Sequence, residues 1–209
     1  SWGYYQPLEG SGSMTCAGIA SLVISSDVIH QSDARVIGDR IDCCIRSDSE
    51  ISDKIENGIA WLARNYSIER NPGQRVGSLW HLYYLYAVER VGRLTAQRFI
   101  GASDWYREGA NYLIRQQESL SGFWVGSGHS EEDRNIATSY ALLFLSKGRR
   151  PVLMAKLKFG VGDDWNQHRA DVNNLTQYVE SQWKRELTWQ VIDLEAASVG
   201  LVCVRRGAG

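Results

Sequence analysis

The strongest constraint on the fold comes from residues 105–150, which contain two helical patterns of opposite character. In residues 105–116, apolar side chains recur at helical spacing and polar or charged side chains occupy the other side. In residues 136–145 nearly every side chain is apolar, and a helix without a polar stripe must be covered by protein on most sides. The stretch therefore predicts a helical hairpin in which a half-polar outer helix covers an apolar inner helix.

The same hairpin pattern occurs earlier in the chain. Residues 54–65 align with residues 105–116, and the alignment places Gly58 on Gly109. The inner partner of this earlier outer helix is the aromatic segment 79–91. The chain therefore contains two complete copies of one helical hairpin.

A third copy is incomplete. Residues 14–24 form its inner helix, with Thr15 matching Thr138, and residues 1–4 look like the tail of the preceding corner. Because no outer helix precedes this copy, we expect the chain to be a piece of a longer polypeptide. The missing repeats of that polypeptide are expected partners.

Residues 27–53 lie between the first inner helix and the next outer helix, and their apolar positions are sparse. We expect a short helix with loops there, around Ile37 and Ile41. Ser52 and Asp53 then predict the N-cap of the helix that starts at residue 54.

The corner of the complete repeat resembles a known motif. Residues 116–124 contain two glutamines followed by Gly-Phe-Trp, and the alanine-rich segment Ala-Thr-Ser-Tyr-Ala-Leu-Leu comes after a loop. This arrangement resembles the QW-type repeat of the squalene cyclase and protein prenyltransferase superfamily. The resemblance implies an all-α fold, a partial α/α toroid, in which an arc of hairpins surrounds a central cavity.

The pattern changes after Pro151. Residues 152–159 are short and amphipathic, residues 171–184 have helical spacing, and residues 188–194 and 201–204 read as strands. This tail resembles a connection in uncharacterised bacterial proteins that joins toroid repeats to a C-terminal α/β domain of unknown function. We predict a toroid repeat segment at 1–150, and a linker with the start of a truncated, mixed α/β domain at 151–209.

Composition limits the classes of partner. The 209 residues are 44% hydrophobic and 22% charged, with a net charge of −1. This balance offers no basic surface for nucleic acid or anionic lipid, so we expect no nucleic-acid partner. The apolar runs are too short for a membrane-spanning segment. The compartment stays open, because an internal N-terminus is compatible with a bacterial protein that is exported.

The resemblance suggests acid catalysis as one possible function of the protein. Squalene cyclases carry an Asp-x-Asp-Asp-Thr-Ala pattern, in which a shielded carboxyl protonates an alkene; such an acid needs a dry pocket. Residues 129–135 could correspond, which makes Asp133 and Glu132 the candidate catalytic residues. They lack that pattern, and we favour a role for Glu131, Glu132 and Asp133 in the first turn of the following helix, where they complement its dipole.

Zinc chemistry has even less support in the sequence. Protein prenyltransferases hold zinc with Asp, Cys and His. Asp42 and Cys44 have suitable spacing but lie in an irregular connection, and no histidine matches the motif. His129 ends a Gly-Ser-Gly-His run, which we interpret as a loop and not as a nucleophile with its base. We therefore predict no metal and no cofactor.

Aromatic residues are the remaining candidates for binding. The chain has eight Trp and ten Tyr. Our candidates to contact an apolar or isoprenoid ligand in the central cavity are Trp80, Tyr83, Tyr84, Tyr86, Trp124 and His129. The first functional hypothesis is a non-catalytic repeat module for binding or scaffolding in a larger bacterial protein. The alternative is a divergent terpene cyclase-like or prenyltransferase-like enzyme acting on an isoprenoid, with ring faces stabilising carbocations. Carbohydrate or peptide binding is a third possibility.

Overall fold

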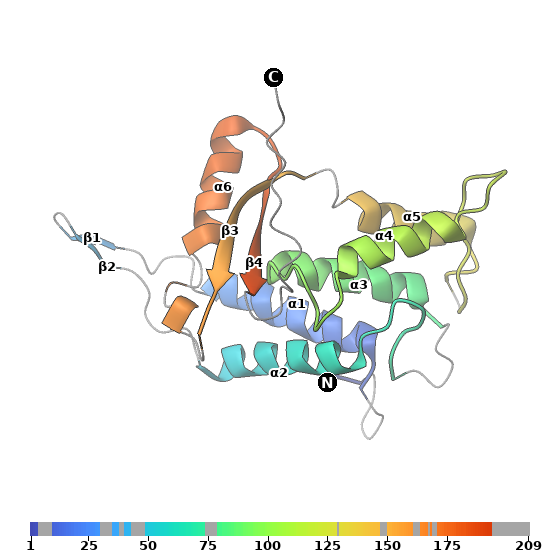
Figure 1. The fold of residues 1–209 in the computed structure, drawn as a ribbon, viewed down its shortest axis with the longest axis horizontal. Helices are drawn as coiled ribbons and strands as arrows, with labels where there is room; N and C mark the ends of the chain where they lie inside the picture. Colours follow the sequence, from blue (N-terminus) through green and yellow to red (C-terminus); the bar gives the residue numbers. More distant parts are fainter. Residues whose placement is uncertain are drawn as a thin grey trace. The chain divides into compact units, whose positions relative to one another are not determined.

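The fold was examined in a computed structural model, which describes residues 1–3, 10–29, 35–37, 40–42, 49–73, 79–128, 130–146, 150–160, 164–166, 168 and 171–193. These residues are mostly helical, with a small parallel sheet near the C-terminal end (Figure 1). The chain divides into two compact units, Ser1–Arg150 and Pro151–Gly209.

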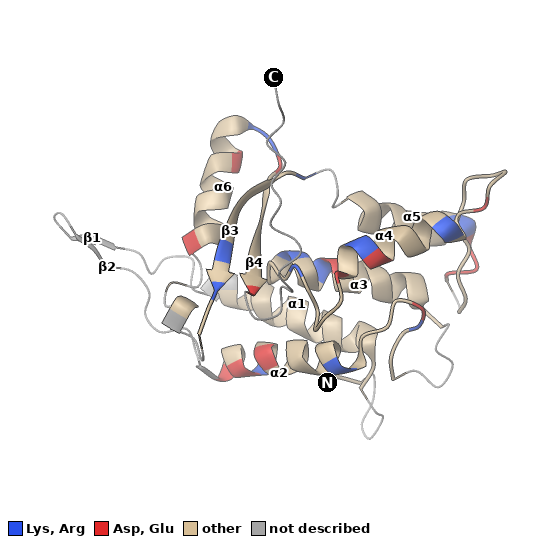
Figure 2. Ribbon diagram, viewed as in Figure 1, with Lys and Arg blue, Asp and Glu red and all other residues tan. Residues whose placement is uncertain are grey.

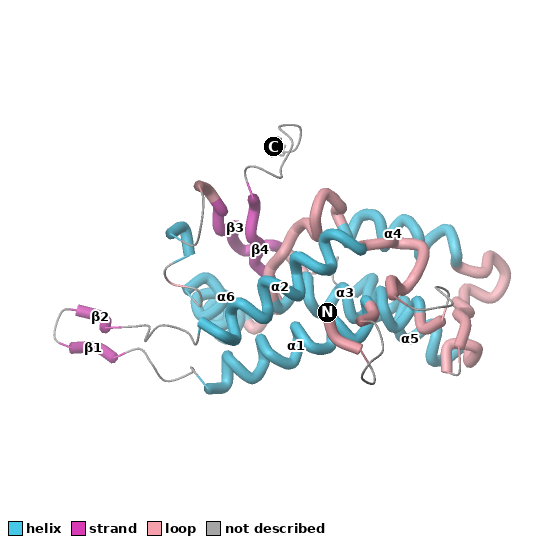
Figure 3. Tube along the Cα trace, turned by 90° about the horizontal axis from the view of Figure 1, so that it is seen from below, coloured by secondary structure: helices cyan, strands magenta, loops and turns pink. Residues whose placement is uncertain are grey.

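The first unit contains helices α1 (Gly12–Ile29), α2 (Ser49–Asn65), α3 (His81–Leu94), α4 (Trp105–Gln116) and α5 (Arg134–Leu145). Helix α3 packs against both α1 and α5. Helix α2 packs on α1, and α4 packs on both α3 and α5 (Figure 3). The helices thus form one row, α1–α3–α5, with α2 and α4 laid against it.

Charged residues are unevenly distributed over these helices. Helix α1 carries almost no charged residue, whereas α2 and α4 carry both acidic and basic residues (Figure 2). Amphipathic helices keep a charged face in water, while an apolar helix is stable only where protein covers it. Charge alone does not separate the two groups, because α3 lies in the row and carries Glu89, Arg90 and Arg93.

Local signals set the ends of α4. The Asp104 side chain accepts a hydrogen bond from the amide of Arg107 at 3.2 Å, which caps the helix at its first turn. The predicted helix at residues 105–116 is confirmed at both ends. By contrast, α2 begins at Ser49, so Ser52 lies inside the helix and the N-cap predicted at Ser52 and Asp53 is wrong.

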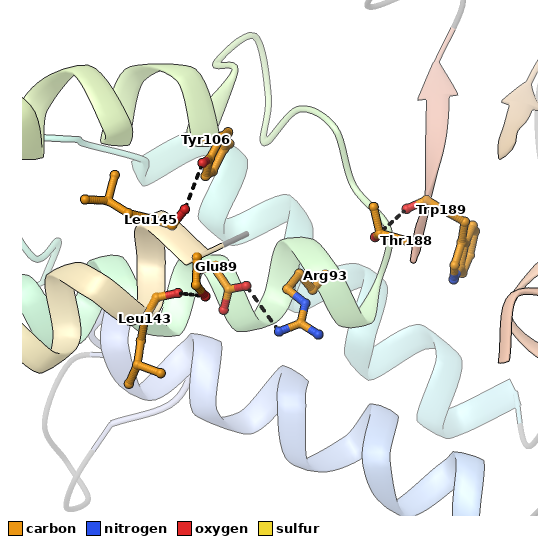
Figure 4. A network of polar contacts seen from close by, with 8 residues as sticks. Glu89, Arg93, Tyr106, Leu143, Leu145, Thr188 and Trp189 are labelled. Atoms are coloured by element: carbon orange, nitrogen blue, oxygen red, sulfur yellow. Dashed lines mark hydrogen bonds and ion pairs between the residues drawn. The ribbon is translucent and has the colours of Figure 1, made fainter. Parts of the chain in front are cut away.

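The hydrophobic core of the first unit lies around α3. Tyr84, Val88 and Val91 of α3 are almost completely buried. The Trp105 ring fills the space beside Gly92, where a Cβ would lie 2.2 Å from the indole. Glu89 is also buried in α3 and pairs with Arg93 at 3.4 Å, one helical turn along (Figure 4).

Helix α5 is less covered than its composition suggested. Ala137, Ala141 and Phe144 face the core, but Leu142 and Leu143 are 54% and 47% exposed. The expectation that protein covers this helix on most sides is wrong for the described residues. The reason is position, since α3 and α4 pack against only part of its circumference. Tyr106 of α4 donates to the carbonyl oxygen of Leu145 at 3.1 Å and ties down the end of α5 (Figure 4).

The same hydrogen bond occurs in two of the predicted repeats. The amide of Trp2 donates to the Thr15 hydroxyl at 3.2 Å, and the amide of Trp124 donates to the Thr138 hydroxyl at 3.2 Å. In each case a corner tryptophan is joined to the first turns of a helix in the α1–α3–α5 row. These two contacts agree with the sequence alignment of Thr15 with Thr138.

The connection between α1 and α2 contains strands. Strand β1 (Arg35–Ile37) pairs antiparallel with β2 (Arg40–Asp42), with Val36 opposite Ile41. The short helix expected there is wrong, because β-branched residues favour the extended backbone of a strand. Asp42 ends β2, while Cys44 lies outside the described residues.

The second unit is a parallel strand pair with a crossover helix. Strand β3 (Val152–Lys158) pairs with β4 (Thr188–Asp193), and the connection contains the 3₁₀ turn η2 (Asp164–Asn166) and helix α6 (Asp171–Trp183). The helix and the strand predicted at 171–184 and 188–194 are confirmed. The amphipathic segment after Pro151 is β3, and residues 201–204 lie outside the described residues.

Side chains hold this crossover in place. Lys156 of β3 donates to the Asp171 carboxylate at 2.8 Å and to the carbonyl oxygen of His168 at 2.8 Å. At the start of β4, the Thr188 hydroxyl bonds to the carbonyl oxygen of Trp189 (Figure 4). In α6, Thr176 is buried, whereas Tyr178 is exposed.

Candidate functional site

Three helices begin beside one pocket of about 170 Å³ in the first unit. Ser13 comes from the first turn of α1, Trp80 and Tyr83 come from the start of α3, and Tyr140 comes from α5. Ser130 and Glu131, which precede α5, complete the lining. The pocket therefore lies where the N-terminal parts of α1 and α3 meet the loop that leads into α5.

Glu131 is the charged residue among the described residues of this lining, and it is completely buried. One carboxylate oxygen accepts a hydrogen bond from the amide of Tyr83 at 2.6 Å, and the other accepts from the amide of Leu82 at 3.1 Å. The first amides of a helix have no partner within the helix, and negative charge is favoured there. Glu131 thus caps α3, and its assignment to the first turn of α5 is wrong.

The loop before α5 is built around this carboxylate. The amide of Gly126 donates to the carbonyl oxygen of Glu131 at 2.8 Å, and the amide of Glu131 donates to the carbonyl oxygen of Gly128 at 2.9 Å. A Cβ on Gly126 would lie only 2.6 Å from the Glu131 carboxylate. A glycine at this position therefore permits the carboxylate to reach α3.

Two opposing effects act on the pKa of Glu131. Burial raises the pKa above its ordinary value, because the charged form loses its hydration. Hydrogen bonds from backbone amides, those of Tyr83 and Leu82 among them, lower it. Burial is the larger effect, so the Glu131 carboxyl retains its proton to a higher pH than an exposed glutamate.

This raised pKa predicts how stability depends on pH. A carboxyl whose pKa is higher in the folded state contributes stability below its ordinary pKa of about 4.5, and loses it as pH rises through the raised pKa. As the pH rises from about 4.5 through the raised pKa, we expect the native chain to lose free energy of unfolding relative to Glu131→Gln. Urea denaturation at a series of pH values measures it, and a constant difference would contradict the prediction.

The two candidate catalytic acids lie outside this buried setting. Asp133 is the N-cap of α5, and its carboxylate accepts from the amides of Asn135 at 2.8 Å and Ile136 at 3.4 Å. Asp133 and Glu132 are both exposed to solvent. The structure therefore does not give either residue the shielding from water that protonation of an alkene requires.

Two of the candidate binding aromatics belong to the core. Tyr84 is completely buried, and Trp124 is 4% exposed. The indole Nε1 of Trp124 donates to the carbonyl oxygen of Leu113 at 2.8 Å, at the end of α4. Both rings are thus committed to packing, and a ligand would not reach them without a rearrangement of the core.

The other candidates lie nearer the surface. Trp80 and Tyr83 line the pocket and are half-buried. Tyr86 lies one turn further along α3, with its ring centroid 5.7 Å from that of Tyr140. His129 is outside the described residues. The structure thus brings Trp80 and Tyr83 together and adds Tyr140 to them.

Sequence reasoning missed four lining residues: Ser13, Ser130, Glu131 as a pocket residue, and Tyr140. Tyr140 could be seen as an aromatic ring in the apolar segment 136–145, but helical spacing does not say which side of such a segment faces a pocket. Glu131 was seen as an acidic residue before a helix, and its true partner is a different helix.

Other reactive groups of the first unit are part of the core. His81 is buried, its Nε2 lies 2.9 Å from the carbonyl oxygen of Ile68, and burial lowers its pKa. Burial also raises the pKa of the Cys16 thiol, which keeps it protonated. Among the described residues, no three His, Cys, Asp or Glu side chains gather as a metal site would require. None of the described helices has the length and apolar character needed to cross a membrane.

The chain matches no protein-family model, no curated protein and no solved structure. Its function is therefore inferred from the geometry of the pocket and of the helices around it.

Proposed function

We propose that residues 1–150 are part of an α/α toroid of the squalene cyclase and prenyltransferase type, and serve as a non-catalytic binding or scaffolding module in a larger bacterial protein. Two observations support this arrangement. Helices α1, α3 and α5 pack in a row with α2 and α4 against it. The bonds from Trp2 to Thr15 and from Trp124 to Thr138 repeat the same corner.

We propose a binding role because the two expected acids, Asp133 and Glu132, are not shielded from water. The Asp133 carboxylate accepts hydrogen bonds from the N-terminal amides of α5. Asp133 and Glu132 are both exposed to solvent. Protonation of an alkene needs an acid that is held away from water, and an exposed side chain does not meet that condition. Neither of the two expected acids, Asp133 and Glu132, therefore has the setting of a cyclase acid.

Half-buried rings provide that surface. Trp80, Tyr83, Tyr86 and Tyr140 project from helices whose opposite faces form the core, so the rings are held by a rigid support. Aromatic rings contribute large apolar contact areas with few rotatable bonds. An apolar or isoprenoid ligand is the class that we propose for this face.

The experiment is to neutralise the candidate acids in the full-length protein. In Glu132→Gln and Asp133→Asn, the second of which keeps a good N-cap residue, we expect no change in the polyisoprenoid that detergent extraction and mass spectrometry recover. We expect Tyr140→Ala to lower the recovered amount. Turnover of squalene or a prenyl diphosphate that stops in Asp133→Asn would overturn the non-catalytic role.

A divergent terpene cyclase-like or prenyltransferase-like enzyme is the second candidate, and one observation favours it. Glu131 is a buried carboxyl with a raised pKa behind aromatic rings, and perturbed groups of this kind occur at catalytic sites. Its hydrogen bonds to Leu82 and Tyr83 already give it a structural role. Turnover of an isoprenoid substrate that is lost in Glu131→Gln, while the folded structure remains, would support this candidate.

A further inference from the structure

The pocket lies at the start of α1 and α3, where backbone amides would normally attract an anion. At the start of α1 these amides already have acceptors within the protein. The amide of Ser13 donates to the Asn71 side chain at 3.0 Å, and the amide of Met14 donates to the Ser11 hydroxyl at 3.3 Å. The amide of Gly12 donates to the carbonyl oxygen of Pro72 at 2.8 Å.

Carboxylates occupy the starts of the other two helices. Glu131 accepts from the amides of Leu82 and Tyr83 in α3, and Asp133 accepts from the amides of Asn135 and Ile136 in α5. These negative charges offset the positive ends of the two helix dipoles. With its donors occupied and carboxylates in place, the pocket disfavours an anionic ligand.

Three aromatic rings form its walls. The rings of Tyr83 and Tyr140 have centroids 5.7 Å apart and planes inclined by 59°, so they pack against each other at a tilt. Trp80 supplies the third ring. The faces of such rings are electron-rich and attract cations.

The backbone at Trp80 is strained. Trp80 has φ of 52° and ψ of 40°, a left-handed conformation that is costly for a bulky residue. Its amide donates to the carbonyl oxygen of Ser127 at 3.0 Å, which helps to hold this geometry. Strain of this kind persists where the surrounding structure requires it.

We propose that this pocket binds a methylated ammonium group through the faces of Trp80, Tyr83 and Tyr140. This inference gives the same rings a cationic ligand in place of the apolar or isoprenoid ligand named above, and it rests on the proposed binding function. Among the residues that the structure describes, the lining contains no lysine, arginine or histidine, and its charged residue is the carboxyl-bearing Glu131. A methylated ammonium is weakly hydrated, so that ring faces replace its hydration at little cost.

A neutral sugar fits the pocket less well. Recognition of hydroxyl groups needs polar side chains with free hydrogen-bonding capacity. The Ser13 hydroxyl already lies 3.1 Å from the Asn71 amide nitrogen and 3.4 Å from the Ser11 hydroxyl. Glu131 has both carboxylate oxygens occupied by amides. Two polar groups of the lining, those of Ser13 and Glu131, are therefore already engaged within the protein.

The test compares choline with 3,3-dimethyl-1-butanol, which has the same shape without the charge, by calorimetric titration into the full chain. We expect choline to bind about fivefold more tightly, the effect of a modest cation–π contribution. Equal affinities would overturn the proposal in favour of a simple apolar pocket. Tighter binding of glucose than of choline would overturn it in favour of a sugar site.

Variants locate the site. Tyr83→Leu and Tyr140→Leu remove a ring face, and we expect each to weaken choline binding about fivefold. Tyr83→Phe and Tyr140→Phe keep the ring and are expected to bind as the native chain does. Tyr178→Leu, at an exposed position of α6, is the matched control for an unrelated tyrosine. Unchanged binding in both pocket leucine variants, with native circular dichroism, would overturn the assignment to this pocket.

The outcomes also separate this inference from the proposed function. Failure of choline to bind, together with polyisoprenoid recovered from the protein, would overturn the ammonium site alone. Turnover of squalene or a prenyl diphosphate would overturn the non-catalytic role, whereas the choline comparison would still be decided by its own affinities.

Discussion

Replacement of Trp105 by alanine is expected to lower the free energy of unfolding by about 3–5 kcal/mol, the usual cost of deleting a large buried ring. Trp105 is completely buried. Its ring meets Phe144 edge-on at a centroid distance of 5.9 Å, and its Nε1 donates to the carbonyl oxygen of Gln97 at 2.7 Å. Alanine would therefore leave a cavity and an unpaired carbonyl between α3, α4 and α5.

Urea denaturation followed by far-ultraviolet circular dichroism measures this loss. Ile114→Ala on the same helix is the control, since Ile114 is 63% exposed and its replacement is expected to change stability by about 0.5 kcal/mol at most. If Trp105→Ala behaved like Ile114→Ala, α4 would not be packed on the core as the structure has it.

Replacement of Glu131 by alanine is expected to cost about 2–4 kcal/mol, because buried amides would lose their acceptors and α3 would lose its cap. The amides concerned are those of Leu82 and Tyr83. The loop that carries Glu131 would also lose its attachment to α3. We therefore expect hydrogen exchange at these two amides to accelerate more than in the rest of α3.

Two variants serve as controls for this prediction. Glu131→Gln keeps a side-chain oxygen as acceptor and is expected to lose less stability than Glu131→Ala at neutral pH. Glu132→Ala removes an exposed neighbouring carboxylate and is expected to change stability by about 0.5 kcal/mol at most. An equal effect of Glu131→Ala and Glu132→Ala would mean that Glu131 does not cap α3.

Several helices could be predicted from the sequence because their signals are local. The spacing of apolar residues and the cap at Asp104 fix α4 within a few turns of chain. Helix α6 and strand β4 were also found by their periodicity. The alignment that placed Thr15 on Thr138 identified two residues that make the same hydrogen bond to a corner tryptophan.

Other features depended on neighbours that a local pattern does not contain. The β1–β2 hairpin was expected to be a short helix, because sparse apolar positions did not reveal which residues pair across a turn. The exposed side of α5 depends on how far α3 and α4 reach around it. The distinction between the core ring Tyr84 and the pocket ring Tyr83 depends on the faces that α3 presents to its neighbours.

The sequence by itself determined where most helices form and which of them carry charge, because helix propensity, capping and periodicity act over a few residues. Only the tertiary structure decided the role of Glu131. Its carboxylate caps a helix that lies 48 residues earlier in the chain, and packing around it sets its burial and its pKa. Burial and electrostatics are sums over neighbours in space, so the pocket could be located only once α1, α3 and α5 were placed together.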